Sequence, residues 1–231
     1  MTESSADMRF TLLAEGTSDR ALLPILQWLL GQHLPNRAIQ PQWADPSRFP
    51  RSPRTLADKI SLAVSVFPCD ILFVHRDSDG PTRTDREQEI KDSVGQVDLL
   101  RVTAICVIPV RMTESWLLTN EVALRRAAGK VTAGPQLDMP LPRQIEALPN
   151  PKERLRQLLR DASGLTGRRL KKFDEGERTQ RIANLMEDYG ALRQRSAFQA
   201  LEADVVSYAK TLLRAEVAHL KDKEDRAVDR E

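Results

Sequence analysis

The sequence predicts an α/β protein with a mostly parallel sheet flanked by helices and with a helical C-terminal region. In the first half of the chain, short apolar runs alternate with stretches of helical periodicity, which is typical of parallel sheets with crossover helices. The run at 69–74 is apolar throughout, as in a central strand covered on both faces. From residue 152 onward, only helical periodicity remains.

Each expected strand is a short run bounded by charged or turn-forming residues. The segment 37–44 contains Pro41, which lacks a backbone N–H and therefore favours the edge of the sheet. The other three segments are apolar enough to be buried strands. The expected strands are 8–14, 37–44, 69–74 and 102–110.

The expected helices follow these strands in turn. Thr17 or Ser18 is expected to cap the first helix, and Pro35 to stop it. The later helices of the first part are expected at 55–67, 84–99 and 113–128. The C-terminal helices are expected at 152–162, 177–190 and 197–220. We divide the chain into an α/β domain (8–128), a linker or irregular excursion (129–151) and a helical region packing on the core (152–231).

The composition excludes few functions, but it gives an expectation for the cellular location of the protein. The 35 basic and 33 acidic residues nearly balance, so total charge indicates no particular partner. No apolar run approaches the roughly 18 residues that a membrane span needs, and the polar, acidic N-terminus is unlike a signal peptide. We therefore expect a soluble, cytoplasmic protein of bacterial type. Cys69 and Cys106 lie in apolar runs and are interpreted as reduced thiols of the core.

Acidic residues follow three of the predicted strands. The carboxyl ends of parallel strands meet at one edge of the sheet, where ligands bind. The first strand leads into two acids, the strand at 69–74 leads into two more, and the last strand is followed by Arg111 and one further acid. The five acidic residues are Glu15, Asp19, Asp77, Asp79 and Glu114.

Five carboxylates at one edge indicate a site for a hard divalent cation. Asp77 and Asp79 are one residue apart in an extended segment, so their side chains point to the same side and repel unless a cation lies between them. Magnesium, or manganese, takes such oxygen ligands, and two ions roughly 3.5–4 Å apart can cleave a phosphodiester.

The order of these acids resembles the Toprim domain of topoisomerases, primases and certain nucleases. The matching residues are Glu15-Gly16 with Asp19 after the first strand, and Asp77-Ser78-Asp79 after the third. The likeness covers roughly residues 8–128. The segment 114–118 (ESWLL) is similar to a pattern of the bacterial family called domain of unknown function 4276, which is related to nucleases of the overcoming-lysogenisation-defect type.

The resemblance implies a Rossmann-like fold and magnesium-dependent cleavage of DNA or RNA. Glu15, Asp77 and Asp79 would bind metal, Asp19 and Glu114 would hold a second ion or orient water, and Arg111 would stabilise charge on the phosphate. It also implies a phage-defence effector that works with a partner ATPase or as a homo-oligomer. Topoisomerase chemistry is disfavoured because the two tyrosines, Tyr189 and Tyr208, are interpreted as core residues.

Other interpretations remain open. The protein could be a non-catalytic interaction subunit with a Toprim fold, or a phosphotransfer enzyme for a small substrate. His75 is interpreted as a structural histidine paired with a carboxylate, with a proton shuttle as the alternative. Arg76 and Arg111 would either hold phosphate or neutralise the acids. Trp116 is interpreted as core, and the basic segment 167–181 as a phosphate-backbone contact, a partner surface or a solvated helix face.

Overall fold

A parallel sheet forms the centre of the computed structural model, which describes residues 7–78, 82–130 and 136–228. Its strand order is β2-β1-β3-β4, and each neighbouring pair is parallel, as predicted. The register pairs Phe10 with Pro41 on one side and with Ile71 on the other. The strands are β1 (Met8–Leu13), β2 (Ile39–Trp43), β3 (Ile71–His75) and β4 (Thr103–Val107).

Both faces of the sheet are covered, which explains the uninterrupted apolar run of β3. Phe10 and Phe73 face one core cluster, with ring centroids 5.4 Å apart in an edge-to-face arrangement. Leu72 and Val74 face a second cluster on the other side. Since successive side chains of a strand alternate between faces, a strand buried on both must be apolar throughout.

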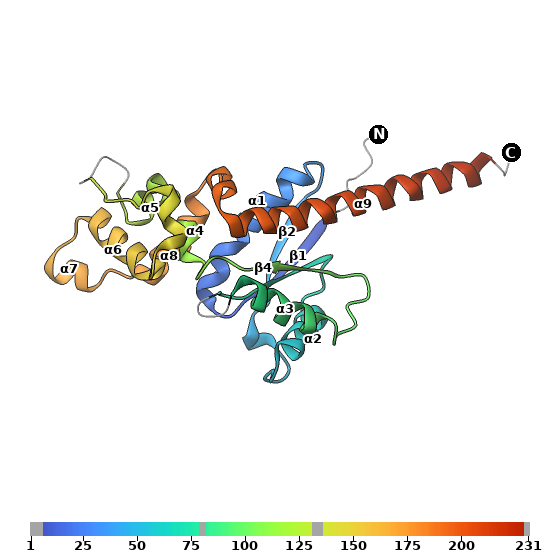
Figure 1. The fold of residues 1–231 in the computed structure, drawn as a ribbon, viewed down its shortest axis with the longest axis horizontal. Helices are drawn as coiled ribbons and strands as arrows, with labels where there is room; N and C mark the ends of the chain where they lie inside the picture. Colours follow the sequence, from blue (N-terminus) through green and yellow to red (C-terminus); the bar gives the residue numbers. More distant parts are fainter. Residues whose placement is uncertain (1–6, 79–81, 131–135, 229–231) are drawn as a thin grey trace.

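Helices form the two outer layers (Figure 1). The first cluster joins the sheet to α1 and to the C-terminal helices, whereas the second joins it to α2 and α3. The N-terminal helices are α1 (Leu22–His33), α2 (Leu56–Val66), α3 (Arg83–Val94), α4 (Glu114–Leu117) and α5 (Glu121–Ala127). The C-terminal helices are α6 (Pro151–Ser163), α7 (Gly167–Lys171), α8 (Glu175–Leu185) and α9 (Ser196–Val228).

The start of the first helix differs from the prediction. A 3₁₀ turn, Thr17–Ala21, precedes α1, and neither Thr17 nor Ser18 caps it. Instead the N–H of Gly16 donates to the Asp19 carboxylate at 2.9 Å. The side chain of Asp19 therefore folds back toward the end of β1, where the other acidic residues lie.

The single helix predicted over 113–128 is wrong, because two short helices replace it. The helix α4 ends at Leu117, and Asn120 begins α5 by accepting a hydrogen bond from the N–H of Ala123 at 2.9 Å. Gly129 follows α5 with φ +88°, a conformation that glycine adopts without strain.

The strand β4 is shorter and less buried than predicted. In the described part of the chain it lies at the edge of the sheet and pairs only with β3, and Thr103 at its start is exposed while Val107 at its end is buried. Its cysteine, Cys106, and Cys69 are both free and half-buried. Burial raises the pKa of the Cys106 thiol to about 11, which keeps it protonated at neutral pH.

The C-terminal region contains the three predicted helices together with α7, but α8 ends at Leu185, before the predicted end at 190, and α9 continues beyond the predicted end at 220. The first half of α9 packs on the core, and Phe198 meets the buried ring of Trp116 with centroids 5.4 Å apart. Figure 1 shows the far end of α9 projecting away from the sheet. No helix in the described ranges is long and apolar enough to cross a membrane.

Between α6 and the first part of the chain, residues 136–150 are mostly irregular but contribute to packing. A 3₁₀ segment, Pro142–Ala147, buries Ile145, and Leu137 is buried as well. A second 3₁₀ segment, Gly190–Gln194, leads into α9. The division of the chain into domains stays a prediction.

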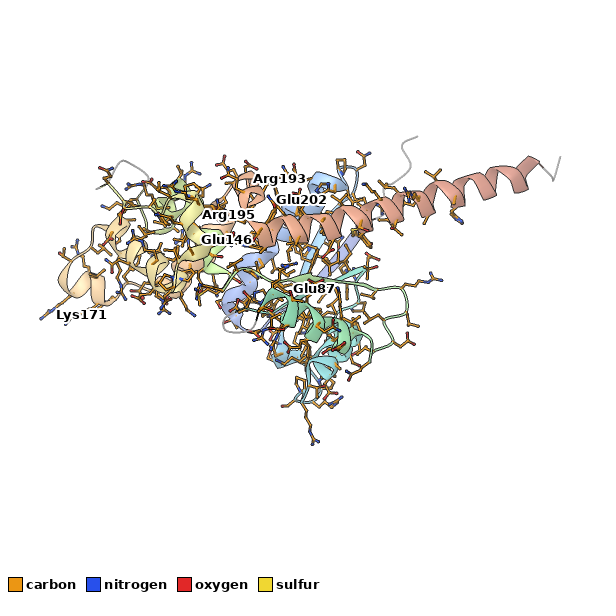
Figure 2. The ribbon with its side chains drawn as sticks, viewed as in Figure 1. Glu87, Glu146, Lys171, Arg193, Arg195 and Glu202 are labelled. Atoms are coloured by element: carbon orange, nitrogen blue, oxygen red, sulfur yellow. The ribbon has the colours of Figure 1, made fainter. Side chains whose placement is uncertain are left out.

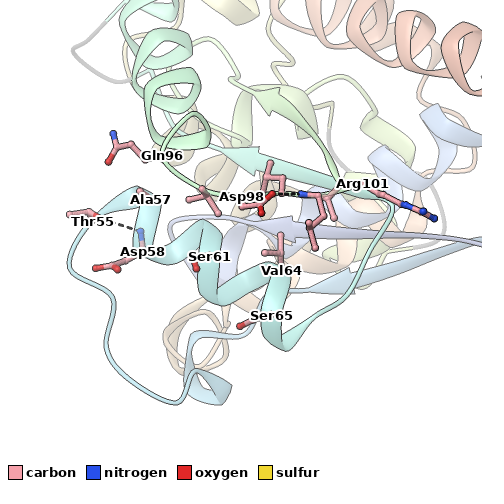
Figure 3. A pocket seen from close by; sticks show the side chains of 13 residues that line it. Thr55, Ala57, Asp58, Ser61, Val64, Ser65, Gln96, Asp98 and Arg101 are labelled. Carbon is pink, nitrogen blue, oxygen red and sulfur yellow. Dashed lines mark hydrogen bonds between the residues drawn. The ribbon is translucent and has the colours of Figure 1, made fainter.

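A cavity of about 1080 Å³ lies between α2 and the loop before β4 (Figure 3). Asp58, Ser61 and Val64 line it from the helix, and Asp98 and Leu100 line it from the loop. Because this loop enters β4, the cavity is at the amino ends of the strands. Of the predicted site residues that the structure describes, none lines it.

Candidate functional site

The strand order defines a switch point between β1 and β3. From β1 the chain moves outward to β2, and it then crosses back to β3 and continues to β4 on the other side. In open parallel sheets, the carboxyl ends of the two strands flanking such a reversal leave a crevice in which ligands bind. Glu15 and Asp19 follow β1, and Asp77 follows β3. The predicted acids therefore lie at the position that the topology favours for a ligand.

His75 links two of these acids. Its imidazole, at the end of β3, is fully buried between the carboxylates of Asp19 and Asp77. Nδ1 is 3.6 Å from Asp19 Oδ2, and Nε2 is 3.3 Å from Asp77 Oδ1. The hydroxyl of Thr113 lies 3.1 Å from Nε2 and 3.5 Å from Asp19 Oδ1. The ends of β1 and β3 and the start of α4 thus meet at one imidazole.

Glu15 contacts Arg76, the residue that follows His75. The guanidinium of Arg76 forms ion pairs with Glu15 and, at 3.0 Å, with Glu89 of α3. Glu89 also pairs with Arg86 at 2.7 Å, and Arg86 Nε donates to the backbone carbonyl of Asp77 at 2.9 Å. The first predicted metal ligand is therefore neutralised by a cation of the protein, which corresponds to one of the two roles considered for Arg76.

Glu114 approaches the same cluster from α4. Burial raises the pKa of its carboxyl group, and the charges of Asp77 and Asp19 raise it further. Lys152 at the start of α6 opposes this effect, with its Nζ 3.8 Å from Glu114 Oε1. Sequence reasoning missed Lys152, because it lies in another helix far along the chain and no motif includes it.

The loop after β4 is tied to the loop after β3. The Ser78 hydroxyl donates to the Pro109 carbonyl at 2.8 Å and accepts from the Arg111 N–H at 2.9 Å. Arg111 has φ +64°, a conformation that costs a residue with a side chain about 1 kcal/mol or more. Within the described ranges its side chain has no ion pair. The predicted site residue Asp79 lies outside the described residues.

The oxygen ligands at this site have the chemistry that a hard cation needs, but they are not arranged as a preformed metal site. The acids offer carboxylate oxygens, and Asp77 Oδ1 is buried without a hydrogen-bond partner. Among the described residues, however, no group of three or more His, Cys, Asp or Glu side chains is arranged to hold a metal ion. Arg76 and Lys152 instead supply positive charge to Glu15 and Glu114.

Comparisons with protein-family models, curated proteins and solved structures find no match.

Proposed function

We propose that this protein is a divalent-metal-dependent phosphodiesterase of the Toprim type that cleaves DNA or RNA. One observation carries the proposal: at the switch point the carboxylates of Asp19 and Asp77 flank the buried imidazole of His75, and Glu114, whose pKa is raised mainly by burial, lies near both of them. Repulsion among these carboxylates is costly to stability unless a ligand relieves it. A cation bound to an oxyanion substrate is such a ligand.

The roles follow from the positions of the described side chains, except that the role of Asp79 follows from the sequence resemblance alone. Glu15, Asp77 and Asp79 would hold magnesium or manganese, which when bound activates water and stabilises the leaving oxygen. Asp19 is held by the Gly16 N–H, and its carboxylate would orient the imidazole of His75, whose Nδ1 lies 3.6 Å away. For Glu15 to bind metal, the guanidinium of Arg76 must release it.

The cations around the acids suit a phosphate group. Arg111 has no ion pair in the described part of the chain, and Lys152 contacts Glu114 only at 3.8 Å with its side chain 46% exposed. Both are therefore available to the phosphate of a substrate, for which arginine offers two parallel N–H donors. In this proposal they compensate charge that develops on the phosphate.

A nucleic acid is favoured as the substrate by the basic helix α7. Four exposed cations lie within five residues, and none forms an ion pair with a described residue: Arg168, Arg169, Lys171 and Lys172. Figure 2 shows Lys171 pointing away from the body of the protein. Such a cluster neutralises backbone phosphates on binding.

Control by a partner ATPase or a second copy, and a role in phage defence, belong to the same proposal.

The test is cleavage of plasmid, linear DNA and RNA by the purified protein with magnesium or manganese. We expect products that disappear with a chelator. Asp77→Asn should lower the rate about 100-fold or more, because charge stabilisation worth several kcal/mol is lost. The matched control is Asp92→Asn, since Asp92 is an exposed acid of α3 that contacts Gln88.

Measurements of metal binding distinguish a protein that is inactive because it lacks a partner from a protein that has no metal site. Manganese titrated into the protein should give saturable heat in a calorimeter, and magnesium should raise the melting temperature. Asp79→Asn should abolish both effects. A folded protein that binds neither ion would rule out the metal site, whether or not cleavage needs a partner.

The non-catalytic interaction subunit is the second candidate, and a specific observation favours it. Arg76 already neutralises Glu15, and Glu89 holds Arg76 from the other side. If the acidic residues serve only to form this ion-pair network, Arg76→Met should destabilise the protein and leave its affinity for metal unchanged. If Arg76 competes with a metal, the same substitution should tighten manganese binding.

A further inference from the structure

Arg195 is a buried cation without a matching anion. Its side chain belongs to a residue that is only 4% exposed, and one terminal nitrogen donates to the carbonyl of Pro142. Its Nε is buried without a hydrogen-bond partner. In the part of the chain that the structure describes, no carboxylate lies within 4.0 Å of this guanidinium. Arginine cannot lose its proton in a protein, so this charge is costly unless something pairs with it.

The position of Arg195 adds to this cost. Its carbonyl accepts the N–H of Gln199 at 3.0 Å, so Arg195 directly precedes the first turn of α9. The N-terminus of a helix carries partial positive charge and favours anions, not cations. The residue that carries the buried guanidinium therefore also stands at the positively charged end of a long helix.

A cavity of about 550 Å³ lies beside this side chain, lined by Arg195, Arg143, Gln194 and Glu146 among others. Arg143 is exposed and has no ion pair with a described residue. Among the described residues, Glu146 is the one carboxylate in the lining, and it accepts from the Ser196 hydroxyl at 3.3 Å. Figure 2 labels Arg195 and Glu146 near the start of α9. Two cationic residues and one acidic residue thus line the cavity.

We propose that this cavity binds the oxyanion group, phosphate or carboxylate, of a small molecule. The two guanidinium groups supply forked N–H donors that match such a group, and the Gln194 amide adds a further donor. The volume lies within the range of small-molecule sites, so the ligand extends beyond the anion itself. This site does not depend on the proposed nuclease activity.

The experiment is calorimetric titration of the full chain with inorganic phosphate and, separately, acetate, at constant ionic strength set with chloride. We expect saturable binding of at least one of them, and the stronger binder identifies the class of oxyanion. Arg195→Met should abolish binding, and Arg143→Met should weaken it about tenfold, as for loss of one charged hydrogen-bond pair. Glu146→Gln should strengthen it, because a repelling charge is removed.

The matched control is Arg193→Met. Arg193 is two residues away but pairs with Glu202 on the surface at 2.9 Å, and its loss should leave anion affinity unchanged. If Arg195→Met does not fold, the opposite effects of the Arg143 and Glu146 substitutions decide the question. The proposal is overturned if neither anion binds saturably, or if all variants bind as the wild type does.

Discussion

Glu114 shows how burial and charge act together on one residue. Burial and the nearby Asp77 and Asp19 raise its pKa, so its folded-state pKa lies above that in the unfolded chain. A carboxyl group with a raised pKa stabilises the folded state fully only below its unfolded value, about 4.3. As the pH rises through the raised pKa, this contribution is lost, and at neutral pH the ionised group is a cost.

Glu114→Gln should therefore raise the melting temperature at pH 7 when no divalent ion is present. The gain should shrink as the pH is lowered toward 4, because the wild-type carboxyl group is then protonated too. Thermal melts followed by circular dichroism between pH 4 and 8 measure this. Glu187→Gln is the control, since that side chain is 86% exposed and its surface ion pair is worth at most about 1 kcal/mol. A gain that is independent of pH would contradict the explanation.

Among the secondary-structure elements, the break between α4 and α5 matters most for the site. It leaves α4 with only four residues, and these place Glu114 toward the acids and Trp116 in the core. A continuous helix would carry the chain onward in a straight line. Asn120 prevents this, because its side chain satisfies a free N–H at the start of α5.

Asn120→Ala should destabilise the protein by about 1 kcal/mol, the usual cost of losing an N-cap. Urea unfolding at equilibrium measures the change. Asn184→Ala in α8 is the control, because the Asn184 amide is exposed and donates to the carbonyl of Gln180 at the long distance of 3.4 Å. Equal effects of the two substitutions would show that the Asn120 cap does not stabilise the break between α4 and α5.

Across the whole molecule, one core cluster connects the sheet to the C-terminal helices. It extends from Phe10 of β1 through Trp116 of α4 to Phe198 of α9. Lys152 adds a polar contact between α6 and the acids, and Gln180 of α8 donates to the carbonyl of Thr17 at 3.3 Å. We therefore expect the sheet and the C-terminal helices to unfold together.

Phe198→Ala should cost about 3–5 kcal/mol, as for other large side chains removed from a core. Tryptophan fluorescence and far-ultraviolet circular dichroism should still report the same urea midpoint. Leu213→Ala in the same helix is the control, since Leu213 is 47% exposed and its loss should change stability by no more than about 0.5 kcal/mol. Separate midpoints for the two signals would contradict a shared core.

Much of the fold could be predicted from local patterns. The parallel sheet, the edge position of β2 and the buried Trp116 all follow from apolar spacing and from one proline. The break at Asn120 was missed because apolar residues continue across it at helical spacing. The edge position of β4 was missed because its apolar run does not tell how many strands lie beyond it.

The sequence by itself determined which strands lead into acids, because Glu15, Asp77 and Glu114 each follow the end of an apolar run within a few residues. Only the tertiary structure decided which charges meet. The burial of His75 between Asp19 and Asp77, and the approach of Lys152 to Glu114, join residues from separate elements. Local propensity acts over a few residues, whereas charge and burial depend on distances that exist only after the helices pack on the sheet.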